Sequence, residues 1–366
     1  MNIQANDLKR QYDLFADEYE KKAVEVLRSG WYIMGRECAA FEQEFAAYLG
    51  ADFCVGVGNG LDALTIAFHT LGIQEGDEVI VCANAYIACV LGITANKGTP
   101  VFVEPNEYDN LDVSKIEAAI TPHTKAILAV HLYGQCCDMD AVMDIAKRHD
   151  LRVVEDCAQS HGACWKGRKS GTFGDISCFS FYPTKNLGGF GDGGALVTDS
   201  KEYAEFMRMY RNYGSKEHYK NDVAGINSRL DELQAGFLRV KLKHLDAFNE
   251  ERQRIAARYD AEVRNPLIHK PQVQPGSTHI YHQYVIHTPC RDNLMAYLKE
   301  KGIGTIIHYP IPPYRSEAYT YLGIQSGAFP ITDQYADEVL SLPVYNGMTA
   351  EEQTYVIDAL NGFKGE

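Results

Sequence analysis

The sequence predicts an α/β fold, with a large domain built on a mostly parallel sheet and a smaller α+β domain at the C-terminal end. Three observations lead to this prediction. The chain has 366 residues, more than a single hydrophobic core usually serves. Short apolar runs alternate with helical stretches over much of the chain, and after residue 245 the strand-like runs become fewer. We therefore place the large domain at residues 1–245 and the small domain at residues 246–366.

The N-terminal segment predicts two helices ahead of the sheet. Residues 8–29 carry apolar side chains at three- and four-residue spacing, as one amphipathic helix does, and Ser29-Gly30 would end it. Residues 41–49 repeat this spacing over a shorter length, and Gly50 is the kind of residue that closes a helix.

Seven apolar runs predict the strands of the large sheet. They are nearly continuous rather than alternating, which is typical of a largely parallel sheet buried on both faces. In chain order they are FCVGVG, EVIVCA, PVFVEP, KAILAVHLY, LRVVED, ISCFSFY and GALVTD. The segments expected to be helical between them include GLDALTIAFHTLG, ITANKG, SKIEAAI and DAVMDIAKRHD.

The C-terminal part begins with one long helical pattern over residues 229–264, which would lead out of the large domain. Two strand-like runs, HQYVIHT and GTIIHYP, then lie on either side of a predicted helix, NLMAYLKEKG. Thr349 followed by Glu352 is a capping box, so it predicts the start of the last helix.

The composition excludes several classes of protein. The formal net charge is −14 and the one short basic cluster is KGRK, so we expect no nucleic-acid binding. No apolar run is long enough to cross a bilayer, and the N-terminus lacks the features of a signal peptide, so we expect a cytoplasmic protein. The ten cysteines are scattered without paired CxxC motifs, so we expect neither a metal site nor disulfides.

A glycine-rich turn at residues 55–64, VGVGNGLDAL, joins a predicted strand to a predicted helix. Free backbone N–H groups and the positive end of the helix dipole would meet there, which suits a phosphate group. A dinucleotide-binding fingerprint is an alternative, but its third glycine and its acidic residue after the next strand are missing. An ordinary tight turn also remains open.

Polar residues follow the predicted strand in VVEDCAQSHG, residues 153–162. Glu155, Asp156, Gln159 and His161 would lie at the carboxyl end of a parallel strand, where crevices form. A carboxylate in this position can hold a cationic ring nitrogen, or its role can be purely structural.

The stretch FSFYPTKNLGGFGDGG places Lys185 between an aromatic strand and a run rich in glycine. A lysine forms a Schiff base only as the neutral amine, and an apolar setting lowers its pKa. Ser180 lies five residues earlier, and the glycines would let the backbone approach a bound ring. The alternative is a lysine in a glycine-rich surface loop.

Together the three stretches indicate one cofactor. A phosphate-ready turn, the carboxylate of Asp156 and the amine of Lys185, all at one edge of a parallel sheet, are the groups that pyridoxal 5′-phosphate requires.

Long motifs in a fixed order run through the chain. They include SGWYIMGRECAAFEQEFAAYLG, EDCAQSHGACWKGRKSGTFGDISCFSFYPTKNLGGFGDGGALVTD, GINSRLDELQAGFL, GIGTIIHYPIPP and SLPVYNGMT. Over nearly the whole chain they resemble the DegT/DnrJ/EryC1/StrS sugar aminotransferases. The resemblance implies the fold of the pyridoxal-phosphate-dependent transferases of the aspartate-aminotransferase type.

The resemblance also implies roles for residues around the cofactor ring. Lys185 would form the Schiff base and then move the substrate's α-proton as general base and acid. Asp156 would pair with the protonated pyridine nitrogen, and Gln159 would contact the ring near its hydroxyl group. Tyr86 would stack on the ring, and packing in the core is the alternative for this side chain.

Further implied roles concern the phosphate. Gly60 and Leu61 would offer backbone N–H groups to it, and Ser180 its hydroxyl group. Leu61 stands where many relatives have threonine, so one hydroxyl contact would be absent. Asn227 matches a residue that reaches the phosphate from the other subunit, which implies a homodimer with two shared sites; a helix N-cap is the alternative for this asparagine.

The implied substrates are L-glutamate and a nucleotide-linked keto-sugar, in the biosynthesis of deoxyaminosugars for surface polysaccharides such as lipopolysaccharide O-antigen. GLDAL and HYPIPP resemble the members that aminate C3 of dTDP-3-keto-6-deoxyhexoses. The substrate-side candidates are Arg229, His308, Tyr309 and Tyr314. Tyr314 stands where those relatives usually have histidine, which leaves the sugar and the carbon open.

Several alternatives remain at this stage. A surface ion pair is the alternative for Arg229, and packing at a strand end is the alternative for His308 and Tyr309. The alternative functions are a C4 aminotransferase on a UDP- or dTDP-4-keto-sugar, a pyridoxal-phosphate-dependent sugar dehydratase, and a non-catalytic member of the same fold. The dehydratases replace the Schiff-base lysine with histidine, so Lys185 counts against them.

Overall fold

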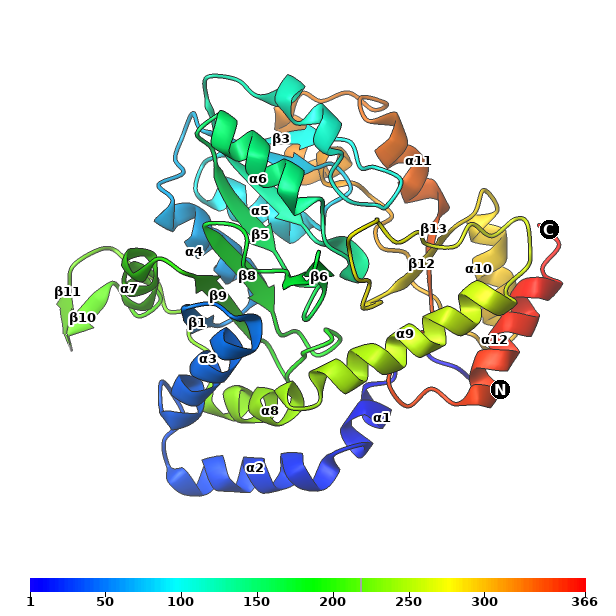
Figure 1. Ribbon diagram of the computed structural model, residues 1–366, viewed down its shortest axis with the longest axis horizontal. Coiled ribbons are helices and arrows are strands. Elements are labelled where there is room, and N and C mark those ends of the chain that lie inside the picture. Colours follow the sequence, from blue (N-terminus) through cyan, green and yellow to red (C-terminus); the bar gives the residue numbers. More distant parts are fainter. Residues whose placement is uncertain (218) are drawn as a thin grey trace.

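The computed structural model describes residues 1–217 and 219–366. A seven-stranded sheet runs through the larger part of the molecule, and a mainly helical part that holds the C-terminus lies beside it (Figure 1). The long helix α9 (Leu245–Glu262) extends from the first part towards the second. In the described part of the chain, no helix is both long and apolar enough to cross a membrane.

The strands of the large sheet stand in the order β1-β9-β8-β5-β4-β2-β3. Strand β9 is antiparallel to both β1 and β8, and the other neighbouring pairs are parallel. The predicted α/β class with a mostly parallel sheet is therefore confirmed, and each of the seven apolar runs forms one strand. The strands are β1 (Phe53–Val57), β2 (Glu78–Cys82), β3 (Thr99–Val103), β4 (Thr124–Val130), β5 (Arg152–Asp156), β8 (Ile176–Ser180) and β9 (Gly194–Thr198).

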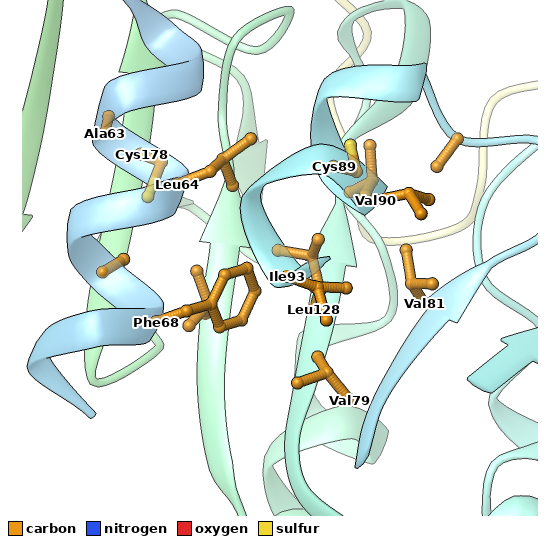
Figure 2. Packing of buried hydrophobic residues seen from close by; sticks show 14 of the residues in the cluster. Ala63, Leu64, Phe68, Val79, Val81, Cys89, Val90, Ile93, Leu128 and Cys178 are labelled. Atoms are coloured by element: carbon orange, nitrogen blue, oxygen red, sulfur yellow. The ribbon is translucent and has the colours of Figure 1, made fainter. Parts of the chain in front are cut away.

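Both faces of this sheet are buried, because successive side chains of a strand point to opposite faces. Val79 and Val81 of β2 belong to a cluster with α4 and α5, whereas Ile80 belongs to a second cluster with α6. Figure 2 shows the first cluster, in which Phe68 of α4 and Ile93 of α5 lie over the strands. The helices around the sheet are α3 (Arg36–Leu49), α4 (Gly60–Thr70), α5 (Ile87–Ala95), α6 (Met139–Arg148) and α7 (Lys201–Tyr210).

Two segments predicted as single helices are each broken in the structure, so both predictions are wrong in this respect. The first helix breaks at residues 14–15 and the second at residues 243–244. The two breaks lie against each other, since the rings of Phe15 and His244 stack with their centroids 3.8 Å apart. The apolar spacing continues across both breaks, and the contact joins residues far apart in the chain, so local periodicity could not reveal it. The resulting helices are α1 (Leu8–Asp13), α2 (Ala16–Ser29), α8 (Glu232–Leu242) and α9.

Short elements account for the other differences in the larger part. The segment SKIEAAI, predicted as a helix, forms two 3₁₀ turns instead, at Val113–Lys115 and Glu117–Ala119. Two small pairs of antiparallel strands were not predicted, because strands of two or three residues are too short to carry a pattern. They are β6 (Cys164–Trp165) with β7 (Arg168–Lys169), and β10 (Ser215–Glu217) with β11 (Lys220–Asn221).

The C-terminal part contains a two-stranded antiparallel sheet of β12 and β13. The predicted strand at residues 304–310 is wrong, because this segment makes a single bridge from Ile306 to Ser341 before Pro310, which lacks an N–H donor for pairing. The capping box of Thr349 and Glu352 is confirmed. The elements are β12 (Tyr284–His287), α10 (Arg291–Glu300), α11 (Pro330–Glu338), β13 (Val339–Leu342) and α12 (Ala350–Gly362), with 3₁₀ turns at Pro313–Arg315 and Glu317–Leu322.

The division of the chain after residue 245 stays a prediction. One core cluster gathers residues between Ile255 and Phe363, and Ile3 joins it from the N-terminus. Tyr314 and Tyr319, in contrast, belong to the cluster that covers the large sheet. Residues after 245 therefore contribute to two different cores.

A buried histidine in the C-terminal part predicts how stability depends on pH. His279 is 4% exposed, its Nδ1 accepts a hydrogen bond from the Tyr281 N–H group (2.9 Å), and burial lowers its pKa from 6.5 to about 3. Below pH 6.5 the unfolded chain therefore binds a proton at this position that the folded chain excludes. We expect His279 alone to remove about 2 kcal/mol of unfolding free energy between pH 6.5 and pH 5.

Urea denaturation at pH 7 and at pH 5 measures this loss. The matched variant is His279→Gln, whose amide oxygen can accept the same hydrogen bond without titrating. Its loss of stability between the two pH values should be smaller by about 2 kcal/mol. Equal losses in the wild type and in this variant would contradict the prediction.

Candidate active site

A cavity of about 460 Å³ lies at the carboxyl ends of the central parallel strands. Its wall includes residues at or just after the ends of β4, β5 and β8, the start of α4, and the segment after β8. This is the position in which open parallel sheets form binding crevices. The predicted site residues that line it are Gly60, Leu61, Tyr86, Asp156, Gln159, Ser180, Lys185, His308 and Tyr309.

The start of helix α4 forms one end of the cavity. Asn59 caps the helix, since its side chain accepts a hydrogen bond from the Asp62 N–H group (2.8 Å). Gly60 is required at the next position, because a Cβ atom there would lie 2.6 Å from the Cβ of Ser180. The first N–H groups of a helix have no partner within the helix, so this close approach gathers them beside the Ser180 hydroxyl group. The turn is thus built for an anion.

Two neighbouring carboxylates at the end of β5 have different environments. Asp156 lines the cavity and is 7% exposed, and its Oδ1 accepts a hydrogen bond from the Ala158 N–H group (2.9 Å). Glu155 is completely buried away from the cavity, where it accepts hydrogen bonds from the N–H groups of Gly171 and Gly174 (2.8 Å each). The alternation of a strand separates them. Asp156 is therefore available for chemistry, and Glu155 holds a loop.

Glu155 also belongs to a buried polar group with His131 and Cys157, whose potential ligand atoms lie within 4.8 Å of one another. The Nε2 of His131 lies 2.9 Å from Glu155 Oε2, and its Nδ1 accepts a hydrogen bond from the Cys137 N–H group (3.1 Å). Burial raises the pKa of the Cys157 thiol to about 12. Hydrogen bonds within the protein therefore explain why these polar side chains are buried close together.

Lys185 lies on the cavity wall in the turn that follows β8, where its N–H group donates to the Tyr182 carbonyl (2.8 Å). Burial lowers the pKa of Lys185 to about 8, and the charge of Asp156 opposes this shift. About a tenth of the amine is therefore neutral at pH 7, far more than for a lysine of ordinary pKa. The alternative of a lysine in a glycine-rich surface loop does not fit this position.

Gln159 connects two elements of the cavity wall. Its Oε1 accepts a hydrogen bond from the Tyr133 N–H group (2.6 Å), and its Nε2 donates to the Tyr309 hydroxyl group (3.0 Å). The ring of Tyr309 lies 4.9 Å from the ring of Tyr86, at an angle of 34°. Tyr86 caps helix α5 and is 47% exposed, so the alternative of core packing is wrong for this residue.

Several cavity residues were missed by the sequence reasoning. His282, Gln283, Tyr182 and Asp192 all line the cavity. The first two precede β12 in the run HQYVIHT, and the other two lie in the stretch around Lys185. Residue type alone gave no signal for them, because they reach the cavity only through tertiary packing.

His308 is held on the cavity wall by a neighbouring strand. Its Nδ1 lies 2.8 Å from the Ser341 hydroxyl group of β13. Burial, and then the charge of Lys185, lowers the pKa of His308 to about 4. The imidazole is therefore neutral at pH 7 and has the Nε2 atom left for a ligand.

Three predicted site residues do not line this cavity. Asn227 is exposed, and it does not cap α8, whose N-cap is Asp231, so the alternative of a helix cap is wrong. Arg229 donates a hydrogen bond to the side-chain oxygen of Asn212 (3.1 Å), an amide rather than a carboxylate. Tyr314 is 3% exposed, and its hydroxyl group donates to Asp333 (2.6 Å) outside the cavity.

The cavity has few positive charges. Among the described residues that line it, Lys185 is the one lysine or arginine, and His131 is already paired with the carboxylate of Glu155, whereas Asp156 and Asp192 are acidic. The cavity wall of one chain can therefore orient an anion with N–H and hydroxyl groups, but it cannot neutralise several phosphate or carboxylate groups.

A comparison with protein families matches residues 14–361 to the family described as DegT/DnrJ/EryC1/StrS aminotransferases. One curated relative is the dTDP-3-amino-3,6-dideoxy-alpha-D-galactopyranose transaminase of Aneurinibacillus thermoaerophilus. It is 49% identical over 359 residues, which cover 98% of each chain.

Solved structures give the same result. A crystal structure of DesV from S. venezuelae, in complex with a ketimine intermediate, superposes with a TM-score of 0.96 at 45% identity and covers 98% of each chain. A structure of NtdA from Bacillus subtilis with bound cofactor PMP superposes with a TM-score of 0.87 at 32% identity, covering 94% of this chain and 81% of NtdA. The comparisons thus agree with one another over nearly the full length.

Proposed function

Because the chain belongs to the DegT/DnrJ/EryC1/StrS aminotransferase family, we propose that it transfers an amino group from L-glutamate to C3 of a dTDP-linked 3-keto-6-deoxyhexose. The protein is a pyridoxal-phosphate-dependent sugar aminotransferase. The observation that carries the finer proposal is the 49% identity to a transaminase named for a dTDP-3-amino sugar. We place this reaction in the biosynthesis of deoxyaminosugars.

The cavity fits pyridoxal phosphate. The glycine at position 60 lets the start of α4 and the Ser180 hydroxyl group converge, as a phosphate requires. Asp156 offers a carboxylate on the same cavity wall, and Lys185 offers an amine whose pKa is lowered to about 8. When bound, pyridoxal phosphate supplies an electron sink that stabilises negative charge on the substrate carbon.

The residues of the chain would then act as follows. Asp156 would hold a proton on the ring nitrogen, and Tyr86 would cover one face of the ring, as its exposed position at the cavity allows. Gln159 would orient the ring edge from its position between Tyr133 and Tyr309. Lys185 Nζ would accept the proton from the α-carbon of the amino-group donor and return a proton to the acceptor sugar.

We also propose a homodimer in which each subunit completes the other's site. The cofactor phosphate, the donor carboxylates and the nucleotide diphosphate need more cations than one chain places around its cavity. Asn227 and Arg229 lie outside the cavity of their own chain, as residues that serve a second subunit would. The consecutive side chains Trp31, Tyr32 and Ile33 are 64%, 51% and 39% exposed, which suits burial against another copy.

The substrate proposal is tested with the purified protein, pyridoxal phosphate and L-glutamate. Three acceptors are compared: a dTDP-3-keto-6-deoxyhexose, a dTDP-4-keto-6-deoxyhexose and a UDP-linked 4-keto-sugar. We expect amination of the first, with mass spectrometry giving the product and NMR the aminated carbon. Amination of a 4-keto-sugar alone would overturn the C3 assignment but leave the aminotransferase intact.

Mixed dimers test the shared site. In a dimer of one Lys185→Ala subunit and one Asn227→Ala subunit, one site keeps both Lys185 and the Asn227 of the other chain. This dimer should retain cofactor in one site and show about half of the wild-type activity, since a two-fold dimer has two equivalent sites. Differently tagged subunits allow the mixed dimer to be isolated. If it performs no better than the average of the two parent dimers, Asn227 does not act across the interface.

A further inference from the structure

The carboxylate of Asp156 is contacted from inside the core as well as from its own loop. Its Oδ1 accepts the Ala158 N–H group at 2.9 Å, and its Oδ2 lies 3.1 Å from the Sγ of Cys89. Asp156 is 7% exposed and Cys89 is completely buried. The two contacts come from different elements, β5 with its following turn and helix α5, so together they restrict rotation of the carboxylate.

Helix α5 connects this contact to the cavity wall. Tyr86, which caps the helix, lines the cavity, and the Cys89 N–H group donates to the Tyr86 carbonyl at 3.0 Å. Residues three apart lie on one side of a helix. Cys89 also belongs to the core cluster labelled in Figure 2, where Val90 and Ile93 of the same helix pack towards the sheet. The thiol is therefore held in place by the core.

Cys89 is a hydrogen-bond donor at neutral pH. Burial, together with the neighbouring charge of Asp156, raises the pKa of its thiol well above the ordinary value. A thiol is a weaker donor than a hydroxyl or an N–H group. It can therefore fix the position of a carboxylate oxygen while withdrawing little of its negative charge.

We propose that Cys89 is a positioning residue for Asp156: its thiol fixes Oδ2 and, as a weak donor, leaves the negative charge of the carboxylate available to the cofactor's ring nitrogen. This inference rests on the proposed function, in which Asp156 faces that nitrogen. Cys89 itself touches neither cofactor nor substrate in this scheme.

Two variants separate this role from simple packing. Cys89→Ala removes the donor, and Cys89→Ser replaces it with a stronger one of similar size. Cys136→Ala is the matched control, because Cys136 is also completely buried but, unlike Cys89, makes no hydrogen bond to Asp156. All proteins are loaded with pyridoxal phosphate, and the visible absorption band of the loaded protein is titrated with pH. Its kcat and KM for the keto-sugar are then measured.

We expect the titration midpoint to shift by about 0.5 pH unit or more in opposite directions in the two Cys89 variants, since they change the charge on Asp156 in opposite senses. The kcat should fall in Cys89→Ala by about threefold or more, with the KM for the sugar unchanged. Cys136→Ala should match the wild type in both measurements, whatever its thermal stability.

Other patterns of shift overturn the proposal. Shifts of the same sign in the two variants, or none, would show that Cys89 only fills space. If Cys89→Ala does not fold, the shift in Cys89→Ser relative to the wild type decides the question alone. A wild-type protein that binds no pyridoxal phosphate and shows no visible band would overturn the proposed function along with this inference, so the two failures are distinguishable.

Discussion

Replacing Lys185 with alanine is expected to lower kcat/KM for amino transfer by at least about 10³-fold, because the variant loses the group that moves the proton as well as the amine that binds the cofactor covalently. The side chain lies on the cavity wall, and burial lowers its pKa to about 8. The fold should be retained, since an alanine here removes an amine whose desolvation costs stability. Turnover with L-glutamate and a 3-keto-sugar measures the effect.

The control for this variant is Lys201→Ala. Lys201 is a highly exposed lysine of α7, with 76% of its side chain accessible, and its partner Glu205 is exposed too. This variant should keep wild-type activity and the visible absorption of the loaded protein. Residual turnover of Lys185→Ala within tenfold of the wild type would show that another base serves the site.

The lowered pKa of Lys185 also predicts a pH profile. Only the neutral amine attacks the carbonyl of pyridoxal phosphate. The rate at which cofactor-free protein takes up pyridoxal phosphate should therefore rise as the pH increases through about 8, and decline below it. Stopped-flow absorbance measures this rate. A rate that is level between pH 6 and pH 9 would not agree with a titrating Lys185.

The second large effect concerns Asp156. In Asp156→Asn the amide cannot hold a proton on the ring nitrogen as a carboxylate does, so kcat is expected to fall by about 10²-fold or more. The same variant removes a charge that raises the pKa of Lys185, so the midpoint for cofactor uptake should move below pH 8. Steady-state kinetics and the uptake rate together measure both effects.

Glu155→Gln is the matched comparison one residue earlier. Glu155 is completely buried, paired with His131, and accepts hydrogen bonds from the N–H groups of Gly171 and Gly174. Removing its charge should lower the unfolding free energy by about 3 kcal/mol. Asp156→Asn, in contrast, should change stability little and activity greatly. Equal effects of the two variants on activity would mean that strand alternation does not separate their roles.

Much of the fold was predictable from periodicity. All seven strands of the large sheet were located because apolar runs mark strands buried on both faces, as Val79, Ile80 and Val81 illustrate. The helix breaks at Phe15 and His244 were not predictable, because the apolar spacing continues across them and the two residues meet only in the tertiary structure. The predicted strand at residues 304–310 was wrong for a similar reason. Its apolar character suggests a strand, but β13 pairs with β12 and makes only a single bridge to this segment.

The candidate site was likewise predictable from the sequence only in part. Lys185, Asp156 and the glycine turn were recognised from residue type and from their position after strands, because parallel strands end at one edge of the sheet. His282 and Gln283 were missed, because they precede a strand of the other part of the molecule and reach the cavity only when the two parts pack.

The sequence alone therefore determined the class of fold and the cofactor. It also showed which predicted strands the glycine turn, Asp156 and Lys185 adjoin. These follow from local periodicity and from side-chain chemistry, which each segment carries by itself. Only the tertiary structure decided that Glu155 is buried while Asp156 faces the cavity, that Cys89 lies against Asp156, and that Tyr314 lies away from the site. These depend on contacts between residues far apart in the chain, and no local pattern encodes them.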